Sequence, residues 1–271
     1  MKNPCGSQLM RSSFELLKAN RKILWLPVFS AASSLLVTFA IAGPALLSIH
    51  GTWGFRQDLV LLIAASVGSL PAIFFNVAIT YAASEQIEGR MVGASDALRF
   101  AWTRRSLIAR WALFSGVVGL VLRVIENRVG ILSKVIGVLG ALSWAVAVFL
   151  IIPVLTFEGL GPKKAIERSS HLLRDNFGTV TRGALAFGGL FVSATFVCIG
   201  IFVAGVATIA VNRELGFVIL AIGLIATMCV GAVSGATSAF MRTILYRHAT
   251  GKSVPNFGID LWTIFQKKPN L

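Results

Sequence analysis

Two glutamates, Glu88 and Glu158, are the residues whose type and position could most readily carry chemistry. Each follows a long apolar run and precedes a glycine. Paired carboxylates serve as an acidic pore mouth, as a proton relay or as general acid and base, and Arg110 and Arg182 would be their counter-charges. The structural interpretation, which we favour, is that each glutamate caps the start of the next helix and neutralises a nearby arginine, because negative charge favours helix N-termini.

A second candidate site lies midway along an apolar run, where Pro71 and Asn76 occur. Proline leaves one helical carbonyl without its partner, and lipid offers no substitute, so this helix is expected to face other helices. A broken helix that lines a solute path is the functional interpretation. A packed kink is the interpretation that we favour.

The remaining polar residues within apolar runs are mostly serine and threonine, which usually bond back to their own helix or join two helices. They include Ser66, Ser69, Ser143, Ser193, Thr195, Thr227 and Ser234. In the last run Gly231, Gly235 and Ala239 recur every fourth residue, and small residues at that spacing predict close helix contact.

Familiar catalytic and metal motifs are missing from the sequence. It contains no nucleotide-binding glycine loop, HExxH or serine–histidine arrangement. His50, His171 and His248 are scattered, and the three cysteines form no CxxC pair. We therefore predict no cofactor, no metal and no catalytic residue, and we favour a protein that is not an enzyme.

Composition places the chain in a membrane. Of its residues 56% are hydrophobic and 13% charged, whereas about a quarter of the residues of soluble domains are charged; the mean hydropathy is +0.80. The net charge of +14 would suggest nucleic acid in a soluble protein. Here the basic residues flank apolar runs, so we expect them to contact anionic lipid head groups, and we expect no nucleic-acid partner.

Six apolar runs are long enough to cross a bilayer. They pair into three hairpins, at about 23–49 with 59–83, 107–124 with 135–156, and 183–211 with 217–241. An amphipathic segment precedes each hairpin, at 8–21, 94–103 and 161–177. We predict an all-α polytopic membrane protein with six transmembrane helices in three hairpins, each preceded by an amphipathic inner-face helix. Its parts are a cytoplasmic segment (1–22), a six-span membrane domain (23–246) and a cytoplasmic tail (247–271).

The basic residues predict the orientation. Lys and Arg number five in each of the segments 1–22, 84–110, 158–182 and 242–271, which makes twenty on one side of the membrane against five on the other. Such an excess marks the cytoplasmic side, so both termini are predicted to be cytoplasmic.

Parts of the chain repeat. Glu88-Gly89 and Arg110-Trp111-Ala112-Leu113 match Glu158-Gly159 and Arg182-Gly183-Ala184-Leu185. The unit would be an inner-face helix followed by two spans, present three times, with any symmetry axis along the membrane normal. True duplication and shared amphipathic composition both remain open as the origin of these matches.

Three stretches carry a resemblance to a known family: FELLKANRKILWLPVFS, IIPVLTFEGLGPKKAIERSSHLLR and ILYRHATGKSVPNFG. They resemble a family of bacterial six-span integral membrane proteins catalogued as a domain of unknown function. The resemblance implies a bacterial plasma-membrane location and this architecture. It brings no reaction, ligand or catalytic residue.

The sequence thus favours a non-enzymatic component of the bacterial plasma membrane, structural, assembling or lipid-organising. Its expected partners are anionic head groups at the inner face, and a second copy or another membrane protein. Two alternatives stay open: a channel or facilitator for a small solute or ion, and a membrane-embedded enzyme acting on lipid through Glu88 or Glu158. A continuous polar path would favour the channel, and a cleft that collects both glutamates and a histidine would favour the enzyme.

Overall fold

The computed structural model describes residues 23, 25–47, 55–128, 140, 143–175 and 177–252, with side chains except at 45–47, 55–58, 123–128 and 177–190. Regular structure within these ranges is helical, which confirms the all-α class. The helices are α2 (Trp25–Leu47), α3 (Phe55–Ile87), α4 (Ala94–Thr103), α5 (Arg105–Arg128), α7 (Ile151–Phe157), α8 (Pro162–Asp175), α9 (Phe177–Ile209) and α10 (Arg213–Ala249). The predicted segment 1–22 and most of the predicted tail lie outside the described residues.

Among the described residues, five helices contain a stretch that is long and apolar enough to cross a membrane. These stretches are Trp25–Pro44, Leu59–Ile87, Arg105–Leu122, Phe191–Ile209 and Arg213–Ala249. The pair Ser143–Phe157 and Pro162–Asp175, bent by 116° at its break, raises the number to six if it is one span. The prediction of a multi-pass membrane protein is therefore confirmed, with five or six candidate spans.

The predicted fourth span, 135–156, is not one continuous helix. The chain turns at 148–150 before α7 begins. Pro153 explains the break, because it has no N–H for the carbonyl of Phe149 and its ring would collide with that carbonyl in a continuous helix. Within this turn the Leu150 N–H donates to a side chain of α8, Ser169 Oγ, at 3.2 Å. Every residue of α7 from Ile151 to Thr156 is buried, so α7 is a short helix inside the core.

The last helix also differs from its predicted bounds. The sixth span was expected at 217–241, but α10 continues to Ala249. No glycine or proline interrupts residues 242–249, and the helix stops only before Gly251, whose φ is +69°. The predicted boundary between membrane domain and tail, at 246/247, thus falls inside a helix.

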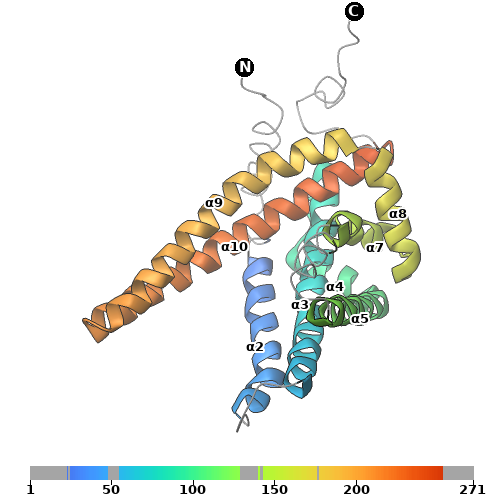
Figure 1. Cartoon of the computed structure of the whole chain (residues 1–271). Helices are drawn as coiled ribbons and strands as arrows, with labels where there is room; N and C mark the ends of the chain where they lie inside the picture. The colour runs from blue at the N-terminus through green and yellow to red at the C-terminus, as the bar shows by residue number, and fades with distance from the viewer. Residues whose placement is uncertain are drawn as a thin grey trace, which may run out of the picture.

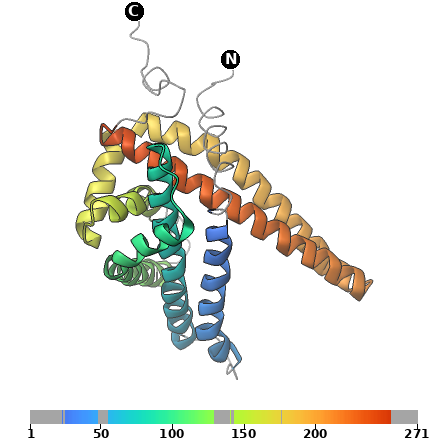
Figure 2. The same cartoon turned by 180° about the vertical axis from the view of Figure 1, so that it is seen from behind.

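Helix α3 is the centre of the packing. It contacts α2, α4, α5, α7 and α10, and α2 runs beside it in both views (Figure 1 and Figure 2). Glycines bring two of these neighbours close: a Cβ on Gly68 would lie 2.0 Å from Thr38 Oγ1, and one on Gly116 would lie 2.2 Å from Ser66 Oγ. Thr38 of α2 thus packs against the backbone of α3 at Gly68, and Ser66 of α3 packs against the backbone of α5 at Gly116.

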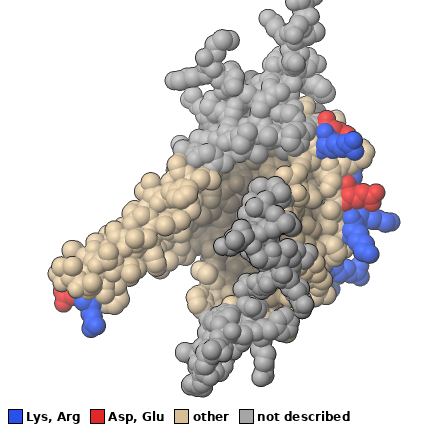
Figure 3. All heavy atoms as spheres, in the orientation of Figure 1, with Lys and Arg blue, Asp and Glu red and all other residues tan. Residues whose placement is uncertain are grey.

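Helices α9 and α10 form a long pair that projects beyond α2 and α3 (Figure 1). In Figure 3 the visible, described face of the projecting part of this pair carries charge only at its tip, and exposed side chains on the pair include Phe196, Phe202 and Phe217. Such a surface suits lipid tails. The close contacts predicted at Gly231 are not found, since no atom lies within 4 Å of a Cβ added there.

The glycines that actually allow α9 and α10 to approach are Gly205, Gly216 and Gly223. A Cβ on Gly216 would lie 2.7 Å from the Ile209 nitrogen, and one on Gly205 would lie 2.9 Å from the Leu220 side chain. Of the predicted stripe, Gly231 has open space, whereas a Cβ on Gly235 would lie 4.0 Å from Pro27 on α2 and Ala239 is buried in the core.

Polar side chains within the spans bond to their own helices. The Asn76 amide donates to the Ala72 carbonyl at 2.8 Å, and the Ser66 and Thr227 hydroxyls donate to carbonyls four residues earlier at 2.7 Å. Pro71 lies inside α3, which continues through it. The prediction that serine and threonine within the spans bond back to their own helices is confirmed at Ser66 and Thr227.

Candidate functional site

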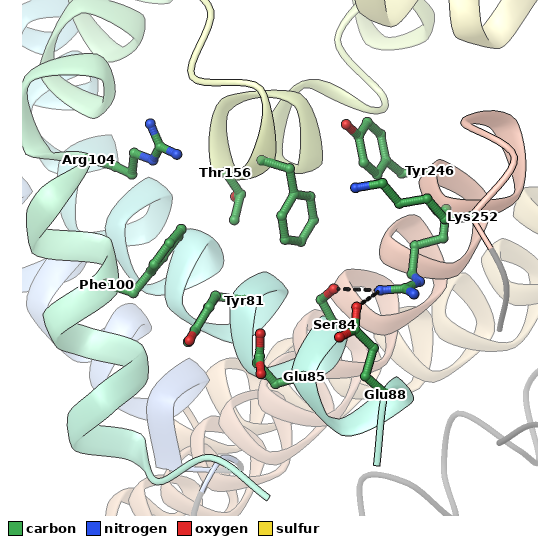
Figure 4. A pocket seen from close by; sticks show the side chains of 11 residues that line it. Tyr81, Ser84, Glu85, Glu88, Phe100, Arg104, Thr156, Tyr246 and Lys252 are labelled. Atoms are coloured by element: carbon green, nitrogen blue, oxygen red, sulfur yellow. Dashed lines mark hydrogen bonds and ion pairs between the residues drawn. The ribbon is translucent and has the colours of Figure 1, made fainter. Parts of the chain in front are cut away.

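Three helices end around one cavity of about 220 Å³ (Figure 4). Its lining comes from the last turns of α3, α7 and α10 and from the turn between α4 and α5. The lining residues are Tyr81, Ser84, Glu85, Glu88, Phe100, Arg104, Thr156, Phe157, Tyr246, Arg247 and Lys252. We call it the helix-end cavity.

A glycine in the left-handed region ends each of the three helices. Gly89 has φ +82°, Gly159 +64° and Gly251 +69°, a conformation that glycine adopts without steric cost. The turn after α3 closes with Arg90 N–H donating to the Glu85 carbonyl at 2.9 Å. The repeated Glu-Gly pair of the sequence is therefore a helix-ending signal that places each glutamate at a helix C-terminus.

Glu88 joins the end of α3 to the end of α10. The Arg247 guanidinium donates to the Glu88 carboxylate at 2.6 Å and to Ser84 Oγ at 3.1 Å, and Arg90 pairs with both Glu88 and Glu85. The hydrogen bond from Arg247 is the main reason that the pKa of Glu88 is lowered; burial opposes the shift and Arg90 adds to it. Glu88 is thus held as an anion.

Glu158 makes the corresponding connection from α7. Arg168 Nε on α8 donates to its two oxygens at 3.1 and 3.2 Å, and the Tyr246 hydroxyl donates to one of them at 2.8 Å. The Phe157 and Tyr246 rings stack with centroids 5.5 Å apart. The two glutamates therefore meet α10 at neighbouring residues, Glu158 at Tyr246 and Glu88 at Arg247.

The predicted counter-charges are not the ones that the described side chains use. Arg110 is exposed on α5 and, within the described part of the chain, forms no ion pair with either glutamate. The side chain of Arg182 lies outside the described residues. The prediction that Glu88 caps the next helix is wrong, because the N-cap residue of α4 is Gly93, which forms no side-chain cap. Neutralisation by arginine does occur, through Arg247 and Arg168.

Of the cavity lining, only Glu88 was a predicted site residue; the residues missed include Arg104, Tyr246 and Arg247. The last two belong to the stretch ILYRHATGKSVPNFG, but no spacing rule joins them to glutamates so far away in the chain. Arg104 lies against Gly159, where an added Cβ would be 2.6 Å from its guanidinium. Pro71 and Asn76 do not line this cavity.

Metal-binding groups do not gather here. Among the residues that the structure describes, no cluster of three or more His, Cys, Asp or Glu side chains is placed to hold a metal ion. His171 pairs with Asp175 at 2.8 Å on the exposed face of α8, and no histidine lines the cavity.

One comparison with known proteins identifies a family. A family model described as a family of unknown function, DUF6159, matches residues 57–254, which is most of the chain. The chain belongs to the DUF6159 family. No curated protein and no solved structure matches it. The resemblance to a family of unknown function is confirmed, and the bacterial origin stays a prediction.

The match to DUF6159 covers the whole helix-end cavity, so the chemistry of this site belongs to the family region of the chain. Both matched glutamates are bound to arginine. For Glu88, whose pKa is lowered mainly by the hydrogen bond from Arg247, a carboxylate stabilised as an anion is a weak general base and a poor proton donor near neutral pH. What the arrangement does well is to tie helix ends together.

Proposed function

We propose that this DUF6159 protein is a non-enzymatic component of the bacterial plasma membrane that organises lipid or assembles with other membrane proteins. The observation that carries the proposal is the use of Glu88 and Glu158. Both carboxylates hold separate helices against the end of α10, which is a structural task. The catalytic interpretation requires a carboxyl group that exchanges protons, whereas the hydrogen bond from Arg247 lowers the pKa of Glu88.

The predicted orientation supports a cytoplasmic position for this cavity. All of its lining lies in or beside the segments 84–110, 158–182 and 242–271, which are rich in Lys and Arg. Lys163, Lys164 and Arg174 are exposed on α8, where they would meet anionic head groups. In this proposal both termini are cytoplasmic, and α4 and α8 lie along the inner face beside three pairs of spans.

The channel alternative receives little support. Asn76, Ser66 and Thr227 direct their polar groups to carbonyls of their own helices, so they do not supply a row of free ligands for an ion. The enzyme alternative also receives little support. Each glutamate is paired with an arginine, and no histidine is among the described residues that line the cavity.

The proposal is tested with the full chain reconstituted in vesicles of labelled phospholipid. We expect no conversion of the lipid by the wild type or by Glu158→Gln, with Glu167→Gln, an exposed neighbour on α8, as the matched control. Lipid conversion that Glu158→Gln abolishes and Glu167→Gln preserves would overturn the proposal in favour of an enzyme. Reporter fusions at each terminus test the orientation, and a periplasmic signal from either would reject it.

A further inference from the structure

The helix-end cavity contains cationic side chains beyond those that its carboxylates neutralise. Arg104 and Lys252 reach it from opposite sides (Figure 4). Neither forms an ion pair with another described residue. Arg104 Nε is buried and has no hydrogen-bond acceptor within the described ranges. A buried donor of this kind is costly unless an acceptor arrives.

The charges of the cavity leave a positive surplus. Its lining holds three cations, Arg104, Arg247 and Lys252, and two carboxylates, Glu85 and Glu88. Arg247 pairs with Glu88, and Arg90, from outside the lining, pairs with both carboxylates. The negative ends of three helix dipoles also face this region, and Arg247 and Lys252 lie where cations offset them. Arg104 and Lys252 have no carboxylate partner among the described residues, so an anion in the cavity would meet both charges.

One wall of the cavity suits the less polar part of such a ligand. The Tyr81 and Phe100 rings stack with centroids 4.1 Å apart, and Arg104 lies 5.6 Å from the Phe100 ring. Tyr81 also carries a hydroxyl that can donate to an oxygen. Planar guanidinium, ammonium and hydroxyl donors together match the several oxygens of a phosphate group.

We propose that the helix-end cavity binds a phosphate ester, supplied by the head group of an anionic membrane phospholipid, with Arg104 and Lys252 as its charged donors. The choice of lipid rests on the proposed function, because the lining follows the ends of α3 and α10, at the depth where head groups lie. The aromatic wall receives the glycerol, and the acyl chains lie along the apolar helices outside.

The experiment titrates the detergent-solubilised full chain with short-chain phosphatidylglycerol and measures binding by native mass spectrometry. Separate arms use short-chain phosphatidylcholine, glycerol 3-phosphate and inorganic phosphate. The variants are Arg104→Gln and Lys252→Gln, and Arg105→Gln is the control, since Arg105 is an exposed neighbour that stacks on Trp102 outside the cavity. Lys252 is exposed at the end of α10, so its variant tests the site even if Arg104→Gln fails to fold.

We expect phosphatidylglycerol to bind more tightly than phosphatidylcholine, and each cavity variant to weaken it about tenfold or more, since charge-assisted hydrogen bonds have that strength. Arg105→Gln should bind as the wild type does. Equal binding by all variants would overturn the proposal. Saturation by inorganic phosphate or glycerol 3-phosphate without lipid binding would overturn the lipid source. Lipid conversion or periplasmic termini would reject the proposed function, whereas binding in detergent still reports on the cavity itself.

Discussion

Replacement of Glu88 by glutamine measures how strongly the end of α3 is tied to the end of α10. The Arg247 guanidinium donates to this carboxylate at 2.6 Å; the Arg247 side chain is 7% exposed and the Glu88 side chain 32%. Glutamine keeps the size and one acceptor oxygen. It removes the negative charge that offsets a buried guanidinium.

The magnitude follows from this uneven burial. Removal of one partner from a fully buried ion pair costs about 3–5 kcal/mol, whereas exposed pairs contribute about 0–1 kcal/mol. Because a third of Glu88 is exposed, solvent screens part of the interaction, and we expect Glu88→Gln to lower the free energy of unfolding by about 1–2 kcal/mol. For a chain of this size that corresponds to roughly 2–8 °C in Tm.

The assay is thermal unfolding of the full chain in detergent. Glu214→Gln is the matched control, because Glu214 is exposed at the start of α10 and forms no ion pair with any described residue. A double-mutant cycle with Arg247→Gln should show a coupling of about 0.5–3 kcal/mol between Glu88 and Arg247. Additive effects, or equal Tm values for Glu88→Gln and Glu214→Gln, would refute this account of the contact.

The same contact makes stability depend on pH. Its arginine partners lower the pKa of Glu88 below the usual 4.5, so the folded state binds this proton less readily than the unfolded state. The stabilisation is complete above pH 4.5 and is lost as the pH falls through the lowered pKa. The difference in Tm between wild type and Glu88→Gln should therefore shrink below pH 4.5.

Glycine variants give the remaining predictions, each read as a change in Tm. Gly159→Ala should destabilise by more than the about 1–2 kcal/mol of a left-handed alanine, because its Cβ also meets Arg104. Gly251 has a positive φ but nothing within 4 Å of an added Cβ, so Gly251→Ala should show the backbone cost alone. Gly161→Ala should show neither the backbone cost nor a collision. Equal changes in Tm for these three variants would contradict this reasoning. Gly216→Ala should cost about 1–3 kcal/mol through its collision with α9, while Gly231→Ala, with nothing within 4 Å, should be neutral or stabilising. A larger loss of Tm for Gly231→Ala than for Gly216→Ala would contradict the contact of α9 with α10 at Gly216.

The sequence alone determined the properties that depend on neighbouring residues. Apolar runs of sufficient length predict membrane helices because the bilayer core requires about twenty apolar residues and internally satisfied backbones. The Glu-Gly pairs marked the points where two helices end, although their role was assigned to the following helix. The sequence also contains Pro153, and a proline within an apolar run disfavours one continuous helix.

Only the tertiary structure decided which side chains meet. Glu88 and Arg247 are 159 residues apart in the chain, and Glu158 and Tyr246 are 88 apart. Such pairs depend on how far α10 continues beyond its apolar run and on the angle at which it crosses α3 and α7. Hydrophobic periodicity states which face of a helix is buried, but it does not state which helix covers that face. The convergence of three helix ends around one cavity is therefore a result of packing.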